Sequence, residues 1–184
     1  PAPGEEPLYG FFFGAGAIIR GMEYFHARIR TKGLKNELGP GLTLLRFVYG
    51  ILRGDPGFAG SQPISAVLDG IAPGQADNTL LLFVSTLDRF FLGMRPYWGK
   101  EPEPLHFTRI LEKPQRLLRV LPSIIRGRPN RHVSEAAGYH SHNALTVRLI
   151  MDGRFSLDGE LHEASAERGA VEIECAGRLH FICL

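Results

Sequence analysis

The sequence contains little cysteine, little net charge and no long apolar run. Two of its 184 residues are cysteines, and the short hairpin expected around Cys175 and Cys183 would leave their thiols out of register for a disulfide. Two reduced thiols are typical of a cytoplasmic protein. The formal net charge of +2 is too small to indicate a nucleic-acid partner. No apolar stretch reaches the ~18 residues of a membrane-spanning helix, so none is expected.

Several catalytic signatures are also missing. The sequence has no Gly-x-x-x-x-Gly-Lys-Ser/Thr loop and no Gly-Gly pair, and therefore no evident cradle for a nucleoside triphosphate. It has no Gly-x-Ser-x-Gly, which argues against an α/β-hydrolase. Gly14-Ala15-Gly16 lies between an expected strand and an expected helix, as in dinucleotide-binding loops, but the third glycine of that pattern would fall at Ile19. Close packing of the helix start on the sheet is the favoured explanation.

The remaining sequence predicts a single α+β domain over 1–184. Short apolar or alternating runs indicate strands, and apolar residues at helical spacing indicate helices. We expect an antiparallel, β-sandwich-like sheet with helices packed at the front and in the middle. The second helix is apolar nearly all the way round over 42–52, which indicates burial on several sides or a homodimer contact. The expected strands are 8–13, 64–68, 80–84, 105–111, 144–151, 154–158 and a hairpin over 171–184, and the expected helices run to about 30, over 40–53 and over 115–127.

The helix expected over 115–127 has a basic face. Guanidinium groups bind oxyanions through two parallel hydrogen bonds, so the arginines between Arg116 and Arg131 could face the phosphates of a nucleotide or of an anionic lipid. A solvated helix face is the alternative. The spacing predicts Leu117, Leu118, Leu121, Ile124 and Ile125 inward and Arg116, Arg119 and Arg126 outward.

Three histidines lie close together in the sequence. His132, His140 and His142 could suggest zinc, but a zinc site needs further ligands of defined geometry and none is obvious. We therefore expect histidines on the surface or in loops.

The most informative tetrapeptide is Leu157-Asp158-Gly159-Glu160. Asp-Gly pairs usually mark turns, and we expect hairpin turns at Asp69-Gly70 and Asp152-Gly153. Asp158 differs because Glu160 follows it after a single glycine, just past an alternating strand. Two interpretations stay open: a simple turn, or a catalytic carboxylate.

The order of these segments resembles the C-terminal domain of the diacylglycerol kinase-like lipid kinases, a family that includes sphingosine and ceramide kinases. The resemblance covers essentially the whole chain, with two departures. Ala17 stands where the family often has aspartate, and Lys100-Glu101-Pro102-Glu103 stands where the family tends to have the acidic ligands of a structural Mg²⁺. The resemblance rests on the strand, turn and helix from Tyr9 to Met22, on Asp69-Gly70, on Pro96-Tyr97-Trp98-Gly99-Lys100-Glu101 before Leu105 to Ile110, and on Leu157-Asp158-Gly159-Glu160.

The resemblance implies the acceptor-binding domain of a two-domain, ATP-dependent lipid kinase. The N-terminal nucleotide-binding domain, absent from this chain, would be its partner, with a lipid substrate and a transient membrane surface. ATP and Mg²⁺ would act in the full-length protein, and we expect none bound to this chain alone. Asp158 would be the catalytic base. Gly159 would allow close backbone approach, and Glu160 would face the nucleotide or its Mg²⁺.

The resemblance also implies two further groups of residues. Glu101 and Glu103 are the candidate ligands of a structural Mg²⁺. Phe90, Phe91, Tyr97 and Trp98 are candidates for the wall of the lipid site or for membrane contact, with ordinary core packing as the alternative. A non-catalytic module that binds a lipid or a partner protein remains the second interpretation of the whole chain.

Overall fold

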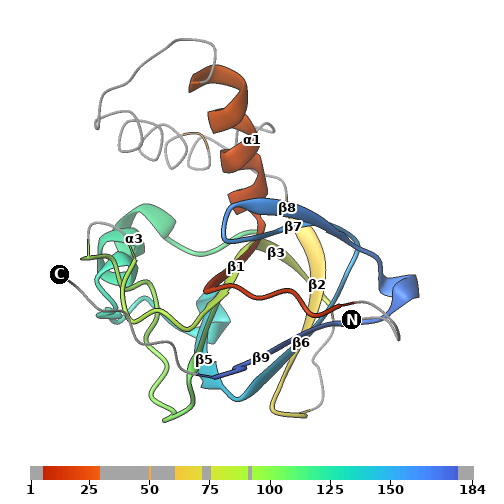
Figure 1. The fold of residues 1–184 in the computed structure, drawn as a ribbon. Helices are drawn as coiled ribbons and strands as arrows, with labels where there is room; N and C mark the ends of the chain where they lie inside the picture. Colours follow the sequence, from red (N-terminus) through yellow and green to blue (C-terminus); the bar gives the residue numbers. More distant parts are fainter. Residues whose placement is uncertain (1–5, 30–49, 51–60, 72–75, 91–92, 178–184) are drawn as a thin grey trace, which may run out of the picture.

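The computed structural model describes residues 6–29, 50, 61–71, 76–90 and 93–177, and these form a curved antiparallel sheet with two helices (Figure 1). This confirms the expected α+β, sandwich-like architecture. The helices are α1 (Ala17–Ile29) and α3 (Leu117–Ile125). The strands are β1 (Phe12–Gly16), β2 (Gln62–Leu68), β3 (Asp77–Ser85), β4 (Leu105–Leu111), β5 (Tyr139–Ala144), β6 (Thr146–Met151), β7 (Gly153–Leu157), β8 (Glu160–Ala164) and β9 (Val171–Glu174).

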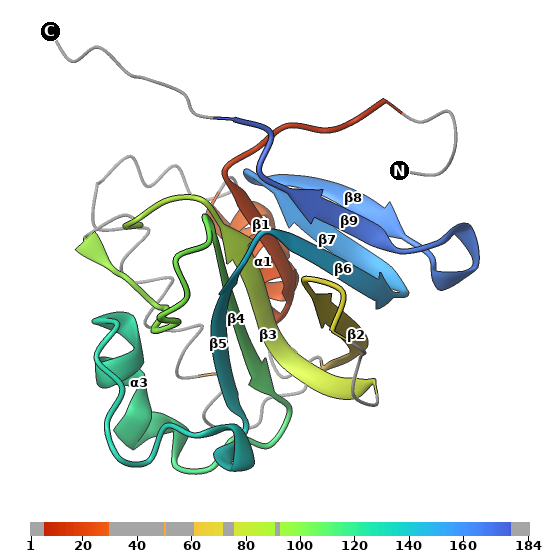
Figure 2. The same cartoon turned by 90° about the horizontal axis from the view of Figure 1, so that it is seen from below.

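Strand β3 joins the three parts of the sheet. One part continues from β3 through β1 and β7 to β8, a second through β2 and β6 to β9, and a third through β4 to β5. Strands β1 and β2 pair with different halves of β3, at Leu82 and Thr79 respectively. Figure 2 shows α3 beside β4 and β5, away from β8 and β9.

Two apolar cores lie on the sheet. The larger core unites residues of both long branches, including Phe13, Leu82, Leu149 and Phe155. The smaller core lies under α3, where Val120 and Ile124 pack with Leu80, Ile110 and Tyr139. Burial of side chains of this size is the main stabilising term of such a domain.

The buried side chain of Arg109 links β2, β3 and β4 through hydrogen bonds. The Nε of Arg109 donates to Thr79 Oγ1 at 2.9 Å, and its Nη2 donates to the carbonyl oxygens of Ile64 and Asp77 at 2.9 and 3.0 Å. Burial lowers the pKa of Arg109, and the carboxylate of Asp77 opposes that shift. No sequence pattern indicated that the side chain of Arg109 would be internal.

Several expected boundaries are wrong. Gly14 and Gly16 belong to β1, which starts at Phe12 rather than at 8, and α1 begins only at Ala17. Gly16 has φ +73°, and a Cβ there would stand 2.6 Å from the carbonyl oxygen of Leu80, so close packing explains this glycine.

Two strands were missed, and one expected turn has another role. Strand β5 precedes the expected strand at 144–151, and β8 replaces an expected connection. Strands β6 and β7 are not neighbours, so Asp152-Gly153 does not close a hairpin. Apart from residue 50, the expected helix over 40–53 lies outside the described residues, and so does Cys183. No helix in the described part of the chain is long and apolar enough to cross a membrane.

Candidate functional site

Asp158 and Gly159 are the two residues of the turn between β7 and β8. Leu157 pairs with Glu160 across the hairpin, which leaves a two-residue loop. Both loop residues have positive φ, 49° for Asp158 and 97° for Gly159, as the favoured two-residue hairpin turns require. Aspartate tolerates this left-handed region better than most side chains do, because its carboxylate can bond to nearby backbone groups.

The Asp158 carboxylate binds the backbone at the start of β1. The N–H of Phe12 donates to Oδ1 at 2.8 Å, and the N–H of Phe11 donates to Oδ2 at 2.9 Å and to Oδ1 at 3.1 Å. The backbone N–H of Asp158 donates to the carbonyl oxygen of Phe12 at 2.9 Å. A Cβ on Gly10 would stand 2.9 Å from Asp158 Oδ2 and 2.7 Å from Leu157 Cδ1, so only glycine leaves room for this contact. The side chain therefore braces the junction of β7 with β1.

Asp69 makes the same arrangement elsewhere in the sheet. It follows β2 as Asp158 follows β7, has φ 51°, and precedes Gly70 with φ 75°. Its Oδ1 accepts the N–H groups of Leu145 and Thr146, both at 2.8 Å, and its own N–H donates to the carbonyl oxygen of Thr146 at 3.0 Å. The bracing role thus belongs to two aspartates of this fold.

Asp158 differs from Asp69 in its neighbour, because Glu160 follows it across the hairpin turn. Both aspartates are exposed, and Oδ2 of Asp69 accepts no hydrogen bond from a described residue. The Asp158 carboxylate accepts three N–H contacts, only one of them at Oδ2. Since a carboxylate offers about four acceptor positions, one position on Oδ2 stays open to solvent. Glu160 is also exposed, and its side chain makes no hydrogen bond or ion pair with any residue that the structure describes. Two carboxylates thus lie at one exposed hairpin end, one fixed and one free.

Within the described part of the protein, the backbone of Gly159 makes no close approach to another segment. A Cβ at this position would meet no atom within 4 Å, so glycine is required here by its φ of 97°. Its N–H donates to Ser156 Oγ at 3.2 Å, and Ser156 itself is fully buried. The hydroxyl of Ser156 therefore helps to fix the conformation of the turn.

Two of the candidate lipid-site aromatics pack against other rings. Phe90 meets Phe12 and Phe83 edge to face, with ring centroids 5.2 and 5.6 Å apart, and Tyr97 at 6.0 Å. Tyr97 is 3% exposed, stacks on His106 at 4.1 Å, and its hydroxyl donates to the carbonyl oxygen of Leu87. Burial, opposed by the charge of Arg95, raises the pKa of Tyr97 to about 12.

Trp98 does not form an open apolar wall either. Trp98 packs, partly buried, against the small core under α3. Phe91 lies outside the described residues. Phe90, Tyr97 and Trp98 thus show ordinary core packing, which was the alternative to a role in the wall of a lipid site.

The candidate Mg²⁺ ligand Glu101 is engaged within the protein. Its Oε2 accepts the N–H of Asn143 at 2.9 Å, and its Oε1 lies 3.2 Å from His142 Nδ1. Burial alone would raise the pKa of Glu101, but the Asn143 N–H and His142 outweigh it and lower the pKa to about 2. Glu103 is half-buried and takes no part in these contacts.

The three histidines are not brought together. His142 lies between two carboxylates, with Nε2 3.2 Å from Glu135 Oε1. Burial lowers the pKa of His140, whose Nε2 is buried without a hydrogen-bond partner. His132 instead contacts Arg116 Nη1 through Nδ1 at 3.2 Å. Among the described residues, no group of three or more His, Cys, Asp or Glu side chains could hold a metal ion.

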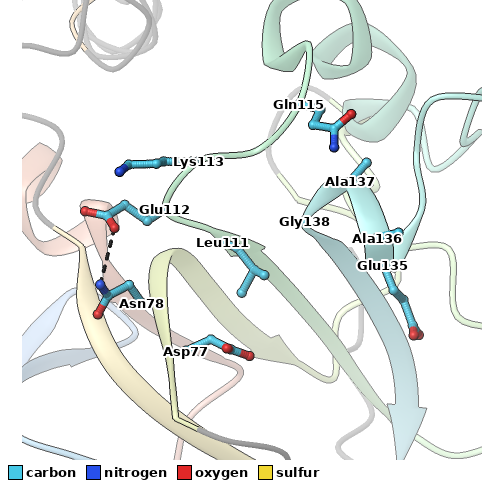
Figure 3. Close-up of a pocket in the computed structure, with 10 residues that line it drawn as sticks. All are labelled: Asp77, Asn78, Leu111, Glu112, Lys113, Gln115, Glu135, Ala136, Ala137 and Gly138. Carbon is cyan, nitrogen blue, oxygen red and sulfur yellow. Dashed lines mark hydrogen bonds between the residues drawn. The ribbon is translucent and has the colours of Figure 1, made fainter.

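A polar pocket of about 260 Å³ lies near β4 and the short 3₁₀ helix η2 (Glu135–Ala137) (Figure 3). Its carboxylates already have partners, since Asn78 and Ser61 donate to Glu112 and Asp77 lies 3.6 Å from Arg109. None of the site residues predicted from the sequence lines it. The lining residues are Asp77, Asn78, Leu111, Glu112, Lys113, Gln115, Glu135, Ala136, Ala137 and Gly138.

Comparison with known proteins gives matches among solved structures alone. No family model matches the sequence, and no curated protein matches it. A diacylglycerol kinase from Bacillus anthracis str. Sterne is similar, with 10% identity and a TM-score of 0.43 over 90% of this chain and 44% of that protein. A candidate diacylglycerol kinase from the same organism gives 14% identity and a TM-score of 0.46 over 91% and 47%. The chain thus spans less than half the length of these proteins, which bear the name of the family that the segment order resembles.

Proposed function

We propose that this chain is the acceptor-binding half of an ATP-dependent lipid kinase, which transfers the γ-phosphate to a lipid hydroxyl. One observation carries the proposal. The Asp158 carboxylate is fixed by two backbone N–H groups at an exposed hairpin end, keeps one acceptor position open, and has the free Glu160 beside it. The order of sequence segments around this hairpin, which resembles the lipid kinase family, supports the assignment.

In this mechanism, Asp158 accepts the proton of the acceptor hydroxyl. Phosphoryl transfer depends mainly on positioning and charge stabilisation, so a carboxylate that is already fixed suits the task. As the hydroxyl oxygen forms its new bond to phosphorus, its proton passes to Oδ2, the oxygen with the open position. Bound ATP would supply the phosphoryl group from the nucleotide domain. Glu160, exposed and unengaged, is the residue that would face the nucleotide or its Mg²⁺.

The described residues do not fit the second, structural Mg²⁺. The Glu101 carboxylate is taken up by Asn143 and His142, and no cluster of three or more ligating side chains occurs in the described ranges. Glu101 and Glu103 are therefore not proposed as metal ligands.

The partners remain part of the proposal. They are a lipid substrate, a nucleotide-binding domain and a transient membrane surface, in a cytoplasmic protein. A homodimer contact over 42–52 would lie, apart from residue 50, outside the described residues.

A second candidate function follows from Asp69. Because Asp69 makes the same contacts without a neighbouring glutamate, Asp158 could be explained by bracing alone. The chain would then be a non-catalytic module that binds a lipid or a partner protein.

Matched substitutions in the full-length protein separate the two functions. Asp158→Asn and Asp69→Asn each remove one carboxylate charge from the same kind of turn, and both are assayed with labelled ATP against a panel of hydroxylated lipids. If Asp158 is the base, Asp158→Asn lowers turnover by ~10²–10⁴-fold, while Asp69→Asn keeps it within about threefold of the unmodified protein. Equal turnover of the two variants, or no phosphorylation of any lipid by the unmodified protein, would leave the binding module as the better explanation.

A further inference from the structure

The outward face of α3 is basic around an exposed leucine. At 3.6 residues per turn, Leu118, Arg119, Pro122 and Arg126 fall within about 100° of the helix circumference. All four are exposed, and Leu118 is 66% exposed, contrary to its expected inward position. The opposite face is fixed by Val120 and Ile124 in the small core, so this orientation of the helix is set by packing.

Two further arginines adjoin this face. Arg116 precedes the helix in the left-handed region with φ 55°, and contacts His132 at 3.2 Å. The segment after α3 folds back on it, since Asn130 Nδ2 donates to the carbonyl oxygen of Arg119 at 3.4 Å. Burial, and then the charges of Arg116, Arg131 and Arg119, lower the pKa of His132. We call Arg116, Leu118, Arg119, Arg126 and Arg131 the arginine surface.

The charges of the arginine surface are not neutralised within the described part of the chain. None of its four guanidinium groups lies in an ion pair with a described carboxylate. Two exposed arginines elsewhere are paired, since Arg148 Nε lies 2.9 Å from Glu172 and Arg154 Nη1 lies 2.7 Å from Glu23. Arg20, Arg89 and Arg168 are exposed and unpaired among the described residues, but they are scattered over different elements. Clustered guanidinium groups attract anions. Their mutual repulsion also lowers the stability of the folded chain.

We propose that the arginine surface docks on an anionic lipid membrane. Guanidinium groups bind headgroup phosphates, and an exposed apolar side chain among them enters the boundary between headgroups and acyl chains. A single-stranded nucleic acid would also attract arginines, but its binding sites usually add aromatic rings on which bases stack. The arginine surface has a leucine at that place and no Phe, Tyr or Trp.

This inference deepens the proposed function and rests on it for the membrane as a partner, because it names the surface that would contact that membrane. It depends on the charge and shape of α3 and holds equally for a kinase and for a non-catalytic binding module. Binding to vesicles needs no ATP, so its failure would leave the result of the lipid kinase assay unchanged.

Co-sedimentation with vesicles tests the proposal, with equimolar phosphatidylcholine and phosphatidylglycerol as the anionic membrane and phosphatidylcholine alone as the neutral one. We expect the chain to bind the anionic vesicles, more weakly as salt is added. Each basic residue near such a surface contributes about fivefold, so the triple variant Arg119→Gln, Arg126→Gln, Arg131→Gln should bind on the order of 100-fold more weakly.

A matched triple variant tests whether clustering, rather than total charge, is responsible. Arg20→Gln, Arg89→Gln and Arg168→Gln remove the same charge from exposed positions on α1, after β3 and in the 3₁₀ helix η3 (Ala166–Arg168). This control should change binding by no more than about threefold.

Single substitutions test the leucine. Leu118→Gln should weaken binding by ~5–10-fold. Leu145→Gln, at a leucine 58% exposed between β5 and β6, should leave binding unchanged. Circular dichroism confirms that each variant is folded.

The proposal fails if the chain binds neither vesicle or binds both equally, or if the two triple variants behave alike. It also fails if an oligonucleotide is bound more tightly than the anionic vesicles and is lost with the same arginines, which would assign the surface to nucleic acid.

Discussion

The paired turns at Asp69 and Asp158 make a prediction about stability that is separate from activity. Replacing either aspartate by asparagine removes the charge and keeps a residue that tolerates positive φ. At Asp69 one oxygen, Oδ1, accepts both N–H groups, so an asparagine oxygen can keep them. At Asp158 the second oxygen also accepts, at 2.9 Å from Phe11 N, and an amide nitrogen placed there would face another donor.

The expected magnitude follows from these contacts. A hydrogen bond to a charged group contributes ~1.5–3 kcal/mol, and most of it survives when one oxygen remains. Because both turns are exposed, we expect Asp69→Asn to lower the free energy of unfolding by ~1 kcal/mol and Asp158→Asn by ~2 kcal/mol. For a chain of this length, 1 kcal/mol corresponds to ~2–4 °C in Tm.

Thermal and urea unfolding of the unmodified chain and the two variants measure these differences. The bracing explanation predicts that both variants unfold earlier with unchanged m-values. An unchanged Tm for both variants would refute the reasoning, because the carboxylates would then contribute nothing to the junctions of β7 with β1 and of β2 with β6. A larger loss at Asp69 than at Asp158 would contradict the role assigned to the second oxygen.

Two further predictions concern the other carboxylates. The lowered pKa of Glu101 means that its contribution to stability is present above pH 4.5 and is lost as the pH falls from 4.5 toward about 2. Since its side chain is 42% exposed, we expect Glu101→Gln to cost only ~1 kcal/mol at neutral pH. Urea unfolding should show this difference shrinking at acid pH. Glu160→Gln should leave the Tm of the chain unchanged but raise KM for MgATP about tenfold in the full-length protein, and a lowered Tm would contradict the free state of this side chain.

The parts of the fold with clear apolar patterns could be predicted from the sequence. Strand β9 alternates Val171 and Ile173 with exposed glutamates, and β4 and α1 lie close to their expected ranges. The missed strands lack such patterns for physical reasons. Ser141 in β5 is polar and yet buried. Its burial is possible because its hydroxyl accepts the N–H groups of Trp98 and Gly99 from a distant loop.

The helix over 117–125 shows why apolar content can mislead. The left-handed conformation of Arg116 delays the start of the helix, and the sheet covers a narrow stripe around Val120 and Ile124. Leu118 therefore stays outside, although the spacing predicted it inward. No sequence pattern reveals how wide a stripe the rest of the protein will cover.

The candidate site could be located from the sequence but not interpreted. Local spacing identified the turn at Asp158, and the turn is there. Its partners, Phe11 and Phe12, lie 147 and 146 residues away in the chain, and no local pattern encodes such a contact. The equivalence with Asp69 likewise appears only when the strands are paired.

The position of β3 has a mechanical consequence. Phe11 and Phe12, which hold the Asp158 carboxylate, lead into β1, and β1 pairs directly with β3. Leu80 of the same strand packs in the small core that carries α3. The single strand β3 thus connects the two places and fixes the distance between the Asp158 carboxylate and α3. If α3 rests on a lipid surface, β3 holds the Asp158 carboxylate at a constant height above that surface. The hydroxyl of an acceptor lipid would then have to rise to that height to react.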